Sequence, residues 1–203
     1  MGLFTKRRGP RKVGGDGSVQ VFCADEQTAV VVDIDRWQRL ATEVLLAEGI
    51  RGLAELALIF VGETEIAELN ETYMGKEGPT DVLSFPIDAA EAEMVLHGEP
   101  PSRGPDRSPP DPADMPLLLG DVVVCPAVAR AQAATHAGTL DDELALLVVH
   151  GVLHVLGHDH DEPEAMARMR GRERLLLETH HWHGPAPVAF RHDHPDDGAD
   201  GTA

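Results

Sequence analysis

The sequence has few aromatic residues, few cysteines and no long apolar run. Aromatic residues make up 4% of the 203 residues, so base-stacking platforms of the kind used by single-strand binding modules are scarce. The two cysteines, Cys23 and Cys125, are too few for a disulfide framework, and we predict that both are reduced core thiols. No stretch approaches the roughly 18 apolar residues that span a bilayer. We therefore expect a cytoplasmic protein with no membrane partner.

The sequence also has few basic residues. The chain has 17 Lys and Arg residues against 35 Asp and Glu residues, which gives a formal net charge of −18 at pH 7. A surface of this sign repels DNA, RNA and anionic lipid at long range. We expect no DNA partner, and an RNA partner must be held by a few local basic groups.

What is present is the composition of one globular domain. Hydrophobic residues make up 42% and charged residues 26%, and the length suits a single domain. We predict a flexible basic tail at 1–17, one domain at 18–183 and a flexible acidic tail at 184–203. A Pro-rich loop at 87–116 interrupts the domain.

Strands and helices are mixed along that domain. Strands are predicted at 19–23, 56–61, 81–85 and 117–125, and helices at 35–48, 63–73, 126–135 and, with Thr139 as its cap, from about 140 to 156. The last helix is apolar on every side apart from its histidines, so it should be buried. The pattern predicts an α+β domain with helices packed on one small mixed β-sheet.

The buried helix and the turn after it read HGVLHVLGHDH from residue 150 to residue 160. Residues four apart lie on one helix face, so His150 and His154 aim at one point. Gly157 can end the helix in the left-handed conformation and so return a later histidine to that point. Three imidazoles suit one Zn²⁺ per chain and leave its fourth position to water. Three separate core histidines bonded to the backbone are the structural alternative, which this spacing disfavours.

The identity of the third ligand has competitors. His158 and Asp159 lie in the turn itself, where a side chain has less freedom to point back at the metal. We therefore favour His160.

The residue after the first histidine bears on the reaction. The same spacing occurs in the metzincin protease pattern H-E-x-x-H-x-x-G-x-x-H, in which the Glu is the general base. This chain has Gly151 there, and a missing base costs peptide hydrolysis a factor of about 10² to 10⁴. A phosphodiester brings its own charged oxygen and RNA its own 2′-hydroxyl. The sequence thus favours phosphoryl chemistry, with a zinc-bound water as attacking group and no protein general base assigned; a metallopeptidase is the alternative.

Three blocks of the sequence carry a family resemblance: LNETY with PTDVLSFP (69–73 and 79–86), LGDVV (119–123) and the histidine segment. With them the chain resembles the YbeY family, bacterial rRNA maturation factors that are single-strand-specific metallo-endoribonucleases. The resemblance implies a zincin-like α+β fold with His150, His154 and His160 as zinc ligands. It also implies a role in 16S rRNA 3′ end processing and ribosome quality control, with single-stranded or ribosomal RNA and small-subunit components as partners. A ribosome assembly factor with a mainly structural zinc is a further alternative.

Other residues are weaker candidates. Met74 stands where the family pattern has Arg, so that phosphate contact does not transfer to this chain. Candidates for substrate contact or for supporting the metal ligands are Asp121, Asp81, Ser84, Lys76, Arg168 and Arg170. Their structural alternatives are a bulge residue for Asp121, a capping or solvent-facing role for Asp81 and Ser84, and a solvated helix face for the arginines.

Overall fold

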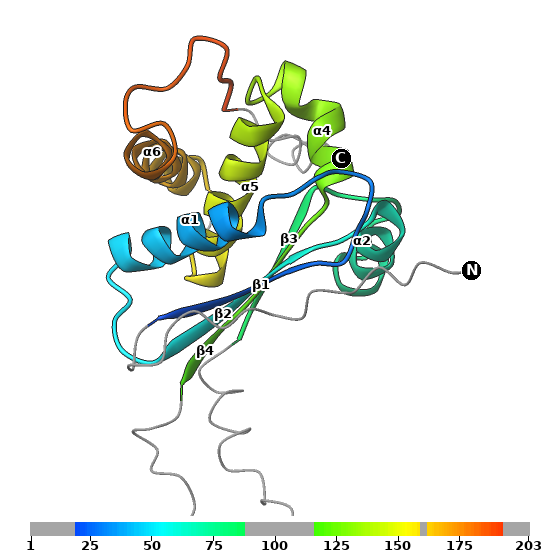
Figure 1. Ribbon diagram of the computed structural model, residues 1–203, viewed down its shortest axis with the longest axis horizontal. Helices are drawn as coiled ribbons and strands as arrows, with labels where there is room; N and C mark the ends of the chain where they lie inside the picture. Colours follow the sequence, from blue (N-terminus) through cyan, green and yellow to red (C-terminus); the bar gives the residue numbers. More distant parts are fainter. Residues whose placement is uncertain (1–18, 88–115, 159–161, 193–203) are drawn as a thin grey trace, which may run out of the picture.

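The computed structural model describes residues 19–87, 116–158 and 162–192, and its strands form one mixed sheet (Figure 1). The sheet has four strands in the order β1-β2-β4-β3. Strands β1, β2 and β4 are parallel, whereas β3 is antiparallel to β4 at one edge. The bounds are β1 (Gln20–Asp25), β2 (Ala54–Phe60), β3 (Val82–Pro86) and β4 (Leu117–Val124). The predicted strands and the small mixed sheet are confirmed.

Of the helices that the structure describes, four fall where the sequence predicts them, whereas no bounds were predicted for the last one. They are α1 (Ile34–Ala47), α2 (Glu63–Leu69) continued by the π-helical turn η1 (Asn70–Met74), α4 (Pro126–Gln132) continued by the 3-10 turn η3 (Ala133–Thr135), α5 (Leu140–Val155) and α6 (Pro163–His180). Helix α5 begins at the predicted cap, because Thr139 Oγ1 accepts from the Asp142 N–H at 3.1 Å. Helix α1 begins at Ile34, one residue before the predicted start. Asp33 caps it by accepting from the Arg36 N–H at 3.3 Å, and Asp35 lies inside the helix.

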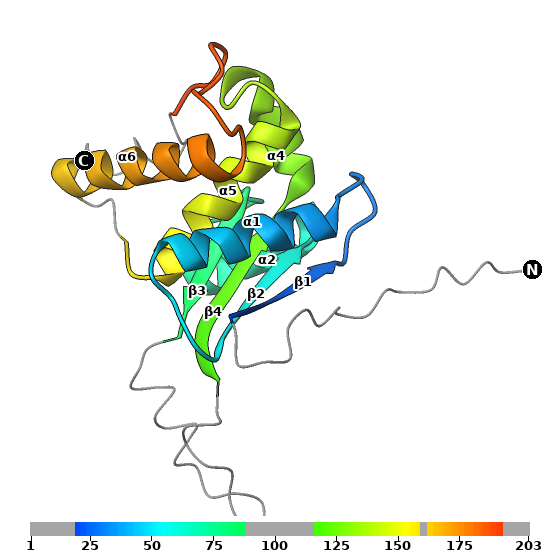
Figure 2. The same ribbon diagram turned by 60° about the vertical axis from the view of Figure 1, so that its left-hand side comes forward.

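Helices cover both faces of the sheet. Helices α1 and α5 pack on one face with α6 outside them, and α2 lies on the other face (Figures 1 and 2). The larger core cluster lies on the α1 and α5 side and includes Trp37 and Phe60, both nearly inaccessible to water. A smaller cluster on the α2 side includes Ile66 and Val123. Burial on all sides of α5 follows from its position between the sheet and α6.

Both cysteines are buried and free, as predicted. Burial, with a smaller effect from the carboxylates of Asp25 and Asp35, raises the pKa of Cys23 to about 12. Burial likewise raises the pKa of Cys125. Both side chains are therefore protonated thiols at neutral pH.

Strand β4 carries one irregularity that decides which way its side chains point. Glu55 pairs with Leu118 and Leu56 with Gly120, so one residue of β4 is bulged. Gly120 has φ of 142°, and a Cβ there would collide with the Phe85 carbonyl on β3. Only glycine fits this position.

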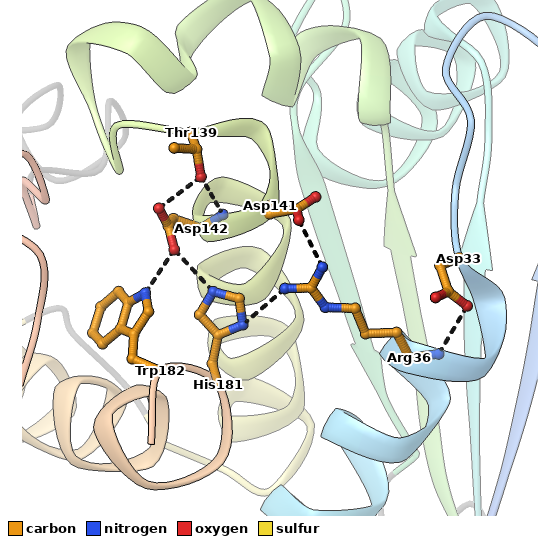
Figure 3. A network of polar contacts seen from close by, with 7 residues as sticks. All are labelled: Asp33, Arg36, Thr139, Asp141, Asp142, His181 and Trp182. Carbon is orange, nitrogen blue, oxygen red and sulfur yellow. Dashed lines mark hydrogen bonds and ion pairs between the residues drawn. The ribbon is translucent and has the colours of Figure 1, made fainter. Parts of the chain in front are cut away.

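The described residues after α6 pack against the rest of the domain. Trp182 Nε1 and His181 Nε2 lie 2.6 Å and 2.9 Å from Asp142 Oδ1, at the start of α5 (Figure 3). Phe190 packs against the larger core, and the Arg191 N–H donates to the His136 carbonyl at 2.8 Å. Residues 184–192 are therefore held against the domain, because aromatic packing and backbone pairing outweigh their polar composition.

Several predicted features fall on the undescribed residues 1–18, 88–115, 159–161 and 193–203. They are the basic tail, nearly all of the Pro-rich loop, the end of the acidic tail, and His160 with Asp159. None of the helices that the structure describes is long and apolar enough to cross a membrane.

Candidate metal centre

Two of the three predicted zinc ligands meet on α5. His150 and His154 lie one turn apart, with their Nε2 atoms 3.1 Å from each other. The two rings are nearly perpendicular, at 76°, with centroids 4.4 Å apart. His150 is buried and His154 is half-buried.

A carboxylate from α6 fixes how the His150 ring is protonated. Glu173 Oε1 lies 2.7 Å from His150 Nδ1, and Glu173 Oε2 lies 2.6 Å from His192 Nε2. An ionised carboxylate only accepts hydrogen bonds, so both of these ring nitrogens carry hydrogen. In the neutral His150 ring the lone pair is then on Nε2, the atom that faces His154.

Glu173 is ionised despite its burial. Its side chain is almost wholly shielded from water, which by itself raises the pKa of a carboxyl group. Hydrogen bonds from His150 and His192 outweigh that burial, and the pKa of Glu173 lies well below its ordinary value. The His150 ring is thus held by a full negative charge.

These donors fit a zinc ion. Converging imidazole nitrogens are ligands that Zn²⁺ prefers, and a carboxylate on the far nitrogen is the usual support of a zinc-bound histidine. Across 19–87, 116–158 and 162–192, no three His, Cys, Asp or Glu side chains are arranged to hold a metal ion by themselves. His160, the predicted third ligand, lies outside these ranges and stays a prediction.

Gly157 ends the helix as predicted. Its φ is 85°, the left-handed conformation that turns the chain away from α5. His158 follows and lies against the end of α1, with Nε2 3.4 Å from Glu48 Oε2. Its ring is thus directed at the end of α1.

Gly151 has a packing reason as well as a chemical consequence. A Cβ at Gly151 would lie 2.5 Å from Val122 Cγ1 and 3.2 Å from Ser84 Oγ, so α5 touches β4 and β3 at this residue. Ser84 Oγ donates to the Gly151 carbonyl at 3.2 Å. The position that carries the general base in the metzincin pattern therefore faces the sheet in this chain.

Ser84 contacts the helix that carries the histidines. Its hydroxyl donates to the backbone carbonyl of Gly151, the residue that directly follows His150. The contact joins the edge strand β3 to α5. We interpret Ser84 as a residue that holds the histidine helix against the sheet.

Asp121 faces away from the histidines. Side chains alternate along β4, where Val122 belongs to the cluster on the α5 side and Val123 to the cluster on the α2 side. Asp121 pairs with Phe85 and shares the α2 side with it. Although the side chain is exposed overall, partial loss of hydration raises the pKa of Asp121. The structure does not bring Asp121 to the His150 and His154 pair.

Asp81 belongs to a different buried network. Its Oδ1 accepts from the Val82 N–H at 2.8 Å, and its Oδ2 accepts from Gln132 Nε2. Gln132 Nε2 also donates to Glu143 Oε1 at 2.9 Å, and Glu143 lies 2.8 Å from His136 Nδ1. The capping alternative describes Asp81 better than substrate contact, because its carboxylate joins β3 to α4 and α5.

The basic candidates do not form one patch. Lys76 is exposed in the turn after η1, and Arg168 is exposed near the start of α6. Arg170 is half-buried on the same helix, whereas Arg172 Nε pairs with Glu48 Oε1 at 2.5 Å. Arg174 pairs with Glu178 one turn later. The solvated-face alternative describes the later arginines well.

Two residues of this centre, Glu173 and His192, were not predicted. Glu173 has a signal in the sequence, since it lies four residues after Met169 and three before Leu176, on the apolar stripe of α6. A carboxylate on a buried stripe needs a partner. His192 has no such signal, because it follows an irregular segment.

A mixed sheet with paired, carboxylate-supported histidines on its buried helix is the framework of a metal-dependent hydrolase. A family model described as "Endoribonuclease YbeY" matches residues 22–181. The Endoribonuclease YbeY of Salinispora tropica is 43% identical over 72% of this chain and 87% of its own length. That of Frankia alni is 41% identical over 90% of this chain and 92% of its own length. On the family model and these relatives, the chain belongs to the YbeY family of endoribonucleases.

Among solved structures, TM1509 from Thermotoga maritima is similar to the chain. The TM-score is 0.47 at 22% sequence identity, over 81% of this chain and 91% of that one.

Proposed function

We propose that the chain is a zinc-dependent endoribonuclease that cleaves single-stranded RNA in the bacterial cytoplasm. In this proposal it has a zincin-like fold and matures ribosomal RNA, including the 3′ end of 16S rRNA, and it contributes to ribosome quality control with small-subunit components as partners. Family membership supports the reaction class. The observation that carries the proposal is the His150 and His154 pair, with the His150 tautomer fixed by Glu173.

The proposed zinc ligands are His150, His154 and His160, one ion per chain. When bound, the zinc supplies a Lewis acid that stabilises negative charge on phosphate oxygens. Glu173 keeps the His150 lone pair on Nε2, so that the ring is ready to coordinate. Contact between Gly151 and Val122 fixes the distance of the histidine helix from the sheet. No residue of the chain is assigned as general base.

RNA must be held locally, because the net charge of −18 opposes its approach. Lys76, Arg168 and Arg170 are the proposed phosphate contacts. They lie on two separate elements, η1 with its following turn and α6, so each is expected to contact a different part of a strand.

The peptidase alternative is weakened by packing. A carboxylate in place of Gly151 would enter the contact with Val122 and Ser84, so this chain has no room there for the metzincin base. The assembly-factor alternative predicts a different result, namely zinc binding without cleavage of RNA.

The test is cleavage of one labelled RNA by purified full-length protein, metal-free or loaded with one equivalent of zinc. We expect cleavage of the single strand only when zinc is present, little cleavage of the same strand annealed to its complement, and no metal-linked cleavage of casein. Casein cleavage that needs zinc and His150 would support the peptidase instead. Zinc binding with no cleavage of any RNA, ribosomal RNA included, would support the assembly factor.

A further inference from the structure

The chain after α6 returns to the metal centre. We call residues 182–192 the return segment. At its start Trp182 Nε1 donates to Asp142 Oδ1 at 2.6 Å. Near its end the Phe190 ring packs edge-on against Trp182, with centroids 4.9 Å apart, and the Arg191 N–H donates to the His136 carbonyl. The segment is therefore fixed on both sides of its turn before it reaches His192.

His192 is the second hydrogen-bond donor to the Glu173 carboxylate. Its Nε2 donates to Glu173 Oε2 at 2.6 Å, while His150 Nδ1 donates to the other oxygen at 2.7 Å. The Phe190 ring lies 5.4 Å from the His192 ring and limits its movement. Glu173 is 3% exposed, so these imidazoles, not bulk water, are the hydrogen-bond donors to its carboxylate.

A carboxylate held at both oxygens cannot turn. The terminal torsion of a glutamate is broad, so a single hydrogen bond leaves the plane of the carboxylate loosely defined. A second donor on the other oxygen fixes that plane and, through it, the orientation of the His150 ring. Partners one step behind a metal ligand commonly govern its orientation and the metal affinity.

We propose that His192 is a positioning residue for His150, acting through Glu173, so that the return segment sets the affinity of the metal centre. This inference rests on the proposed role of His150 as a zinc ligand. It gives a function to a stretch whose sequence suggests only a tail.

The test compares three full-length variants with the wild type. His192→Leu keeps side-chain bulk and removes the donor, whereas His192→Gln retains an N–H donor of similar reach. His183→Leu is the matched control, because His183 is exposed at the end of α6 and its Nδ1 contacts the Thr179 carbonyl at 2.9 Å, away from Glu173. The readouts are zinc affinity, by competition with a chromophoric chelator, and the ring ¹⁵N signals of His150 in metal-free protein.

We expect His192→Leu to weaken zinc binding about tenfold or more and to shift the His150 ring signals. His192→Gln should keep most of the affinity, and His183→Leu should match the wild type. If His192→Leu behaves like His183→Leu in both readouts, the proposal is wrong. Loss in the Leu and Gln variants alike would also contradict it, because the effect would not depend on a donor.

Neither readout involves RNA, so the role of His192 and the ribonuclease function can be refuted independently of each other. Normal zinc affinity in the wild type without RNA cleavage would refute only the ribonuclease. Absence of zinc binding by the wild type would refute the ligand assignment and this proposal with it.

Discussion

The contact of α5 with the sheet at Gly151 predicts an unusual response to alanine. Alanine is favoured over glycine inside a helix by about 1 kcal/mol. At Gly151, however, the new Cβ would lie 2.5 Å from Val122 Cγ1. Val122 is fully buried and β-branched, so it has little freedom to move aside. Overpacking of this kind costs about 1 to 3 kcal/mol.

We therefore expect Gly151→Ala to lower the free energy of unfolding by about 0 to 2 kcal/mol, the overpacking cost less the propensity gain. Gly171→Ala is the matched control, since Gly171 is also helical but has no atom within 4 Å of its Cβ position. That variant should be more stable than the wild type by about 1 kcal/mol. Urea unfolding of the metal-free proteins measures both values.

A double substitution makes the test independent of propensity scales. In a Val122→Ala background the clash is removed, so Gly151→Ala should become stabilising, with a coupling of at least about 1 kcal/mol between the two sites. If Gly151→Ala stabilises the otherwise unaltered chain as much as Gly171→Ala does, α5 does not press on β4 as described.

Three further predictions concern the ligands, acid stability and RNA contacts. His154→Ala should abolish stoichiometric zinc binding in equilibrium dialysis while His158→Ala retains it; the reverse result would overturn the ligand assignment. Burial alone would raise the pKa of Asp142, but its hydrogen bonds lower it overall, so its stabilisation is complete above about pH 3.9 and declines as the pH falls through the lower native value. Asp142→Asn should therefore be less stable at neutral pH and lose less on acidification in urea unfolding from about pH 6 down to about pH 2; an unchanged pH profile would contradict this. RNA affinity should fall with salt at a slope of about −0.7 per phosphate contact, and Lys76→Ala or Arg170→Ala should flatten it, whereas a steep slope unchanged in both variants would show that the contacts lie elsewhere.

The positions of the four strands and of helix α5 could be predicted from the sequence, because the local signals for these elements agree with the fold. Thr139 offers a cap and Gly157 a left-handed stop, and the structure has α5 beginning and ending at these residues. Alternation and apolar runs likewise marked all four strands. The spacing of His150 and His154 needed only the helical period to predict that their rings meet.

Contacts between residues far apart in the sequence could not be predicted from such local signals. Asp81 lies within the PTDVLSFP block, yet its partner Gln132 is 51 residues away, and only the packing of α4 on the sheet brings them together. The face of Asp121 depends on the bulge between Leu118 and Gly120, which shifts the alternation of β4 by one residue. His192 reaches Glu173 only after an irregular turn that no periodicity describes.

Activity as a function of bound zinc would decide whether the paired histidines are the reaction centre. Metal-free protein is titrated with zinc, and the rate of cleavage of a single-stranded RNA is recorded at each addition for the wild type and for His154→Ala. We expect the wild-type rate to rise in proportion to zinc and to level off at one ion per chain, with no rise for the variant. A rate independent of zinc, or equal rates in the two proteins, would contradict a ribonuclease centred on α5.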